Sequence, residues 1–170
     1  MTKAVRQPEK SMQHWAELTD FRFSSSAYAH DKDALKYSMW RPDEKIVAAN
    51  RTLVLEGTYT EAYEASDAIW VGNPVQIVVY EIQKEIKTFT EIFRHSQEDL
   101  MTGLLGTMSK MSLKEGEKHH GYCFVPPETL ESMQHLVLSG FAKYFTYVGF
   151  KWNRSLNMQF LQVTTHLEDE

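Results

Sequence analysis

A long run of regularly spaced apolar residues in the middle of the chain is the strongest constraint on its fold. The intervals alternate between four and three residues, in the order Val75, Val79, Ile82, Ile86, Phe89, Phe93, Ser96 and Leu100. This spacing is typical of an amphipathic helix that packs against a second helix. We therefore expect one long helix over about residues 75–112. Its predicted interface residues are Ile82, Ile86, Phe89, Phe93 and Leu100.

The start of this run also fits a second interpretation. Residues 75–80 read Val-Gln-Ile-Val-Val-Tyr, and β-branched residues are enriched in strands. If they form a strand, the fold becomes α+β, with strands near residues 75–80, 119–125 and 156–166. The sequence leaves this alternative open.

A second helix is predicted over about residues 128–148. The pair Pro126-Pro127 precedes it, and proline is favoured in the first helical turn. Residues 132–150 carry Lys143 as their only formal charge but also several uncharged polar side chains. A membrane-spanning helix needs about twenty predominantly apolar residues, so we interpret this segment as a buried central helix.

A further helix is predicted over about residues 42–56, ended by Gly57 and followed by a new helix start at Thr58. Eight glycines and five prolines in 170 residues are fewer turn formers than average, which favours long helices. The expected fold is mainly α, a helical bundle. We expect one helical domain over residues 11–167, preceded by a loose N-terminal tail over residues 1–10.

Composition excludes several classes of partner. The chain has 18 basic and 23 acidic residues, a net charge of −5, and no basic cluster, so nucleic acid is not an expected partner. A membrane or granule surface is not expected either. Residues 1–10 lack the apolar region of a secretory signal, and a lone cysteine cannot form a disulfide framework. A cytoplasmic location is therefore predicted.

Potential metal ligands gather before the predicted central helix. His119, His120 and Cys123 lie close together in sequence, and His135 lies in the predicted helix that follows them. Imidazole and thiolate are ligands of zinc and other transition metals. The spacing matches no closed metal motif, however, and the alternative interpretation is a polar surface loop with Cys123 packed as a small hydrophobic residue. No cofactor is favoured, although a transition metal is possible.

No known catalytic signature occurs, and no catalytic residue is predicted. The expected function is that of a non-enzymatic helical accessory or scaffold subunit, which associates with itself or with another protein subunit. The alternative is a small helical metal-dependent enzyme or ligand-binding protein that uses His119 and His120 together with His135. Tyr59 and Trp70 could also stack on a flat ligand, although core packing is more usual for such residues.

Overall fold

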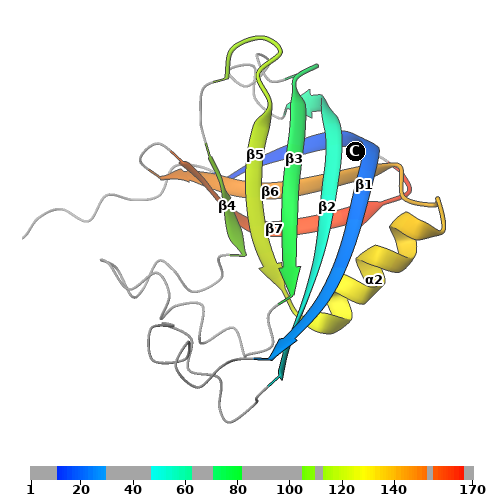
Figure 1. Ribbon diagram of the computed structural model, residues 1–170. Helices are drawn as coiled ribbons and strands as arrows, with labels where there is room; N and C mark the ends of the chain where they lie inside the picture. The colour runs from blue at the N-terminus through cyan, green and yellow to red at the C-terminus, as the bar shows by residue number, and fades with distance from the viewer. Residues whose placement is uncertain are drawn as a thin grey trace, which may run out of the picture.

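The described part of the chain forms a closed β-barrel and one helix, shown in Figure 1. The computed structural model describes residues 11–29, 47–62, 71–81, 105–109, 113–152 and 155–166. Within these ranges the elements are β1 (Ser11–Ala29), β2 (Val47–Ala62), β3 (Pro74–Glu81), β4 (Gly106–Met108), β5 (His119–Val125), α2 (Pro127–Leu138), β6 (Tyr144–Trp152) and β7 (Ser155–Thr164).

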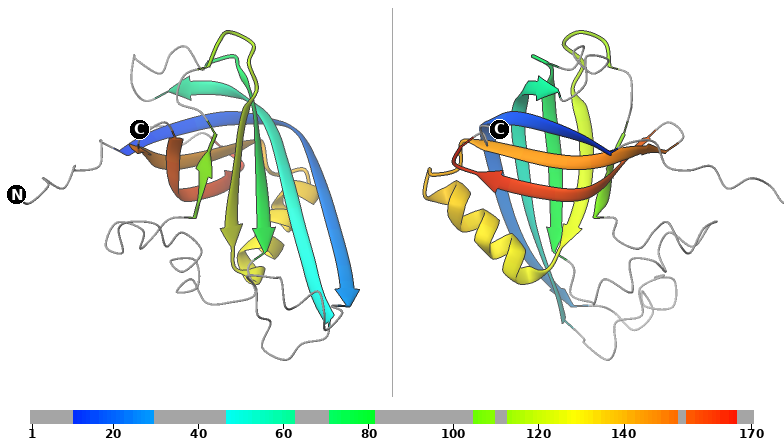
Figure 2. Two further views of the ribbon diagram at one scale, coloured as in Figure 1. Left: turned by 60° about the vertical axis from the view of Figure 1, so that its left-hand side comes forward. Right: turned by 180° about the vertical axis from the view of Figure 1, so that it is seen from behind.

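The strand order around the barrel is β1-β2-β3-β5-β4-β7-β6, and β6 pairs with β1 to close it. Neighbouring strands are antiparallel except for β3 and β5, which are parallel. The long strand β1 belongs to both halves of the barrel, because it pairs with β6 near its start and with β2 along most of its length. In Figures 1 and 2, β6 and β7 run across the upright strands β2, β3 and β5.

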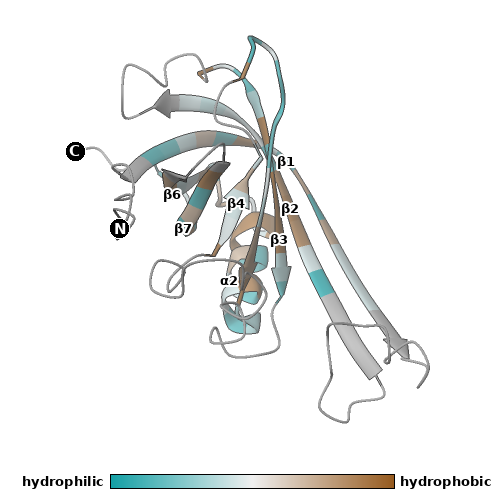
Figure 3. Ribbon diagram, turned by 90° about the vertical axis from the view of Figure 1, so that its left-hand side faces the viewer, coloured by the Kyte–Doolittle hydropathy of each residue, from teal (hydrophilic) through white to brown (hydrophobic). Residues whose placement is uncertain are grey.

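A period of two in the sequence fills the barrel interior. Every second residue along these strands faces inward and is buried, as with Leu53 and Leu55 on β2 and with Val75, Ile77 and Val79 on β3. These strands are adjacent and in register, so their inward side chains form continuous layers. Figure 3 shows apolar positions interrupted by polar ones along β1 and β2.

Helix α2 packs across one end of the barrel. It follows β5 directly, with Pro127 in its first turn, and it buries Leu130, Met133 and Val137 in the same core as the strands. The helix contacts β3 and β7, which are not neighbours in the barrel. Among the described residues, no helix is long and apolar enough to cross a membrane.

An ion-pair group joins the barrel to α2 at this same end. Arg51 on β2 donates hydrogen bonds from its guanidinium to Glu81 on β3 and to Glu131 on α2, the latter over 2.7 Å. The two carboxylates raise the pKa of Arg51 above its usual value, chiefly through these hydrogen bonds. We refer to the opposite end of the barrel, where β3 and β5 begin, as the end away from α2.

The predicted long helix over residues 75–112 is wrong where the structure describes it. Pro74–Glu81 is strand β3 and Gly106–Met108 is strand β4. An interval of four residues fits a strand as well as a helix, because four is a multiple of two, and Val75 and Val79 share the inward face of β3. The predicted interface residues Ile82, Ile86, Phe89, Phe93 and Leu100 lie outside the described residues.

The predicted central helix over residues 128–148 is also wrong in its second half. Helix α2 ends at Leu138, and Gly140 follows with a φ of 72°, a left-handed conformation that commonly ends helices. The chain then enters β6, where Phe145 and Tyr147 point inward with strand spacing. Many of the apolar residues of this segment do face the core, but Gly140 divides them between a helix, α2, and a strand, β6.

The helix predicted over residues 42–56 is replaced by β2, which continues through Gly57 and Thr58. The fold is therefore mostly β, and the expected helical bundle, like its description as all-α, is wrong. The alternative strands near 75–80, 119–125 and 156–166 coincide with β3, β5 and β7, but they belong to a closed barrel rather than to an α+β fold. The predicted tail over residues 1–10 lies outside the described residues.

Candidate functional site

Four polar aromatic side chains converge inside the barrel at the end away from α2. They are His14 on β1, Tyr59 on β2, His119 on β5 and Tyr147 on β6. None of the four is more than 2% exposed. Burial of polar groups costs free energy unless they are hydrogen-bonded, so such a group in an otherwise apolar barrel needs an explanation. We refer to these four residues as the His/Tyr cluster.

The hydroxyl of Tyr59 is the centre of the cluster. Its Oη lies 2.5 Å from Nδ1 of His119 and 2.6 Å from Oη of Tyr147. Because a phenol has one proton, Tyr59 donates at most one of these hydrogen bonds and accepts at least one. The three side chains therefore form a continuous hydrogen-bonded chain across the barrel interior.

His14 completes the cluster from β1. It lies opposite Tyr147 in the pairing of β1 with β6, and the two ring centroids are 5.1 Å apart. The ring of Tyr59 is 6.1 Å from that of His14 in an edge-to-face arrangement. Thr146 fixes the local backbone, since its buried hydroxyl donates to the His14 carbonyl over 2.9 Å. Strand pairing thus sets the position of each ring.

Burial disfavours the charged forms of His14 and Tyr59 in the cluster. Desolvation, reinforced by electrostatic repulsion from His119, lowers the pKa of His14 to about 4, so its imidazole is neutral and retains a nitrogen lone pair. Desolvation also raises the pKa of Tyr59 well above its usual value, with Tyr147 adding to the shift. The cluster thus offers hydrogen-bonding groups together with the neutral imidazole of His14.

The layer beneath the cluster is filled by side chains that lie over glycines. A Cβ at Gly121 of β5 would approach Sδ of Met108 to 2.0 Å, and one at Gly57 of β2 would approach the Phe145 ring to 2.7 Å. Both glycines therefore leave room for side chains from other strands, namely Met108 on β4, which pairs with Gly121 of β5, and Phe145 on β6. The His/Tyr cluster lies above this packed layer, at the end of the barrel rather than in its middle.

A buried asparagine ties together two connections that flank the cluster. The Asn73 side chain donates to the carbonyl of Lys114 and accepts from the backbone N–H of Gly116, both over 2.9 Å. Its backbone carbonyl accepts from the N–H of Tyr59 over 3.1 Å. The loop of residues 113–118 leads directly into His119, so Asn73 holds the entry to β5 against the end of β2.

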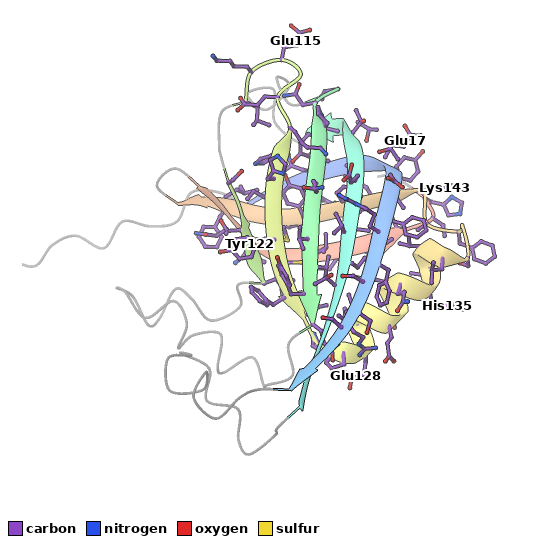
Figure 4. All side chains as sticks on the ribbon, viewed as in Figure 1. Glu17, Glu115, Tyr122, Glu128, His135 and Lys143 are labelled. Carbon is purple, nitrogen blue, oxygen red and sulfur yellow. The ribbon has the colours of Figure 1, made fainter. Side chains whose placement is uncertain are left out.

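The structure brings only one of the four predicted metal ligands into the cluster. His119 points into the barrel, whereas the next residue, His120, is exposed on the outer face beside Gln76. Cys123 also faces the core, away from His120, and burial raises the pKa of its thiol, which opposes nucleophilic reactivity. His135 is exposed on α2, and Figure 4 shows it far from Glu115 at the tip of the loop of residues 113–118.

The described residues contain no group of three or more His, Cys, Asp or Glu side chains placed to hold a metal ion. The predicted site of His119, His120, Cys123 and His135 is thus not assembled. A strand reverses the side-chain direction at each residue, so consecutive histidines on β5 cannot bind one ion together.

Sequence reasoning missed three members of the cluster. His14 precedes the first tryptophan without any motif, and Tyr147 lies in the second half of the predicted central helix. Tyr59 was considered as a stacking residue, but its partners His119 and Tyr147 are 60 and 88 residues away. The position of Tyr147 could have been found from the alternation of Phe145 and Tyr147 with the smaller residues Thr146 and Val148, which indicates a strand.

Comparisons with protein families, curated proteins and solved structures find no match to this chain. The chemistry of the His/Tyr cluster is therefore the basis for assigning a function. Two imidazoles and two phenols can donate and accept hydrogen bonds, and their nitrogen and oxygen atoms can also coordinate a metal ion.

Proposed function

We propose that the protein binds a small ligand at the end of its barrel through the His/Tyr cluster. The observation that carries this proposal is the convergence of two imidazoles and two phenols, from four different strands, in a buried group. Small closed barrels are either filled by side chains or hold one small ligand. Ligand sites combine apolar walls with a few convergent polar groups, which describes this end of the barrel.

This function is the ligand-binding alternative that the sequence raised for His119, but other side chains now surround the ligand. The cluster replaces His120 and His135 with Tyr59, Tyr147 and His14. We propose binding rather than catalysis, since the rings are hydrogen-bonded to one another and enclosed by the packed barrel end.

Native mass spectrometry of protein purified without chelators tests this function. We expect the wild-type chain to carry a bound mass in addition to its own 19.8 kDa. A Tyr59→Phe/Tyr147→Phe variant should lose it. Tyr122→Phe is the matched control, because Tyr122 (labelled in Figure 4) is next to the inward-facing Cys123 on β5 and therefore lies on the outer face. A wild-type chain without any bound mass, or a mass that the double variant retains, contradicts the proposal.

Protein association is a second candidate function, now for a β-barrel rather than a helical subunit. Leu138 and Phe141, at the end of α2, are 60% and 66% exposed. Large exposed apolar side chains that lie close together are typical of interaction surfaces. We propose that this pair contacts a second copy of the chain or another protein subunit. A cytoplasmic location remains part of the proposal, and the buried free thiol of Cys123 is compatible with a reducing compartment.

Sedimentation velocity of the wild type and of Leu138→Ser/Phe141→Ser tests association between copies. We expect a concentration-dependent oligomer in the wild type and a monomer in the double variant. Val71→Ser is the control, since Val71 is 46% exposed but lies in the turn before β3, at the other end of the barrel. A wild-type monomer excludes association between copies, and equal oligomers in all three chains place the interface elsewhere.

A further inference from the structure

The His/Tyr cluster presents its donor atoms at spacings close to those around a metal ion. Oη of Tyr59 is 2.6 Å from Oη of Tyr147 and 2.5 Å from Nδ1 of His119. Adjacent ligands of a six-coordinate ion with bonds of about 2.0–2.1 Å lie about 2.8–3.0 Å apart. The Tyr59 oxygen would therefore need to separate from each of these two neighbouring donor atoms by only a few tenths of an ångström to share an ion with it.

The fourth member of the cluster supplies a further nitrogen donor. The His14 ring is in contact with both phenol rings and lies on β1, next to the Tyr147 strand. Four donors thus come from four strands of one closed barrel, whose backbone pairing fixes their positions. Metal sites built on rigid elements in this way need little rearrangement on binding.

We propose that the His/Tyr cluster is an iron(III) site in which Tyr59 and Tyr147 bind as phenolates and His14 and His119 as neutral imidazoles. This inference rests on the proposed function, because it names the ligand of that same site. It shares His119 with the metal site predicted from the sequence, but not His120, Cys123 or His135, which the fold separates from the cluster.

The donor set selects iron(III) among the common biological ions. Among the described residues, no group of three or more His, Cys, Asp or Glu side chains is placed to hold an ion. In the His/Tyr cluster itself, the phenols are therefore the groups that can supply negative charge. A phenolate oxygen is a hard donor that suits a highly charged ion, whereas imidazole is a general ligand of iron, copper, nickel and zinc. Structural zinc sites instead favour thiolate and imidazole ligands.

Charge and protons balance without any redox step. Each phenol loses its proton to solvent as its oxygen binds the ion, so two protons are released for each ion. Two phenolates reduce the net charge of the site from +3 to +1, which lowers the cost of holding the ion in a buried position. The imidazoles contribute lone pairs and no charge.

Titration of the purified, chelator-treated chain with iron(III) nitrilotriacetate tests the site. Phenolate coordinated to iron(III) gives a charge-transfer absorption band in the visible region, which neither component shows alone. We expect this band to saturate at one ion per chain, and resonance Raman excitation within it to enhance tyrosine ring modes. The Raman measurement uses the wild type, so it does not depend on whether a variant folds.

Variants at the phenols separate this site from adventitious binding. Tyr59→Phe and Tyr147→Phe should each weaken iron binding by more than about tenfold and reduce the visible band, while Tyr122→Phe should match the wild type. Zinc(II) added in competition should displace little of the iron, because the phenolates favour the harder ion.

The outcomes distinguish this inference from the proposed function. An iron-dependent band that is lost in the cluster variants and kept in Tyr122→Phe supports both. No band, or a band that persists in Tyr59→Phe and Tyr147→Phe, overturns the iron site. If iron fails but native mass spectrometry shows an organic mass that depends on Tyr59 and Tyr147, the ligand-binding function stands without iron. If neither is bound, both proposals fail.

Discussion

The Tyr59 hydroxyl lies 2.5 Å from Nδ1 of His119 and joins β2 to β5 across the intervening strand β3. We expect Tyr59→Phe to destabilise the metal-free protein by about 1–2 kcal/mol, because it removes a buried hydroxyl that makes two hydrogen bonds. Urea unfolding in the presence of a chelator measures this change. Tyr122→Phe on the outer face should change stability by less than about 0.5 kcal/mol. Equal effects would show that the Tyr59 hydroxyl has no special role.

The Asn73 side chain should matter through the loop that it holds. Asn73→Ala removes both hydrogen bonds to residues 114 and 116 and leaves buried backbone groups without that partner. We expect a loss of about 1–3 kcal/mol and faster amide exchange at Gly116. Hydrogen exchange followed by mass spectrometry measures the local effect. Unchanged exchange in residues 113–118 would mean that Asn73 does not hold this loop.

Gly121 and Met108 should be energetically coupled. A Cβ at Gly121 would overlap the Met108 sulfur, so Gly121→Ala should destabilise the protein by about 1–3 kcal/mol. Met108→Ala alone creates a cavity and is also destabilising. The double variant should lose less than the sum of the two single changes, because the new methyl occupies space vacated by Met108. Additive losses would show that these residues do not share that space.

The ion-pair group at the α2 end provides a comparison between buried and exposed carboxylates. The side chain of Glu81 is 7% exposed and that of Glu131 is 61% exposed, and both accept from Arg51. Arg51→Met should cost about 3–5 kcal/mol, because it leaves the buried Glu81 charge unpaired. Glu131→Gln should cost less than about 1 kcal/mol. Thermal unfolding of the two variants orders these effects, and the reverse order would contradict the assignment.

Acid sensitivity should depend in part on Glu56 on the outer face of β2. Hydrogen bonds from Gln76 and Lys118, together with the charge of Arg22, lower the pKa of its carboxyl group. A lowered pKa in the folded state stabilises the protein above the unfolded-state pKa, and this contribution is lost as the pH falls through the carboxyl range. Glu56→Gln should lose less stability on acidification than the wild type, by less than about 1 kcal/mol.

The matched control for this acid effect is Glu115→Gln. Glu115 is exposed in the loop of residues 113–118, outside this network, so its replacement controls for the loss of one carboxylate. Urea unfolding at pH 7 and pH 3.5 measures both variants against the wild type. A pH profile that is identical in Glu56→Gln and in the wild type would show that the outer-face network adds nothing to stability.

The sequence by itself determined where the core-forming residues lie, but not their secondary structure. The apolar positions Val75 and Val79 are core residues, as the spacing indicated, and Cys123 packs as a small buried residue. The period could not be assigned because an interval of four fits both a helix and a strand. The Ser139-Gly140 break was visible in the sequence, and it would have divided the predicted central helix correctly.

Only the tertiary structure decided the candidate site. His119 was identified as a chemically significant residue from the sequence, but its partners Tyr147, Tyr59 and His14 lie on other strands, 28, 60 and 105 positions away in the chain. Strand pairing also separated His119 from His120, which adjoins it in the chain yet faces solvent. Local patterns report residues that share one element, whereas the His/Tyr cluster is assembled by barrel closure between β1 and β6, a long-range pairing with no local signature.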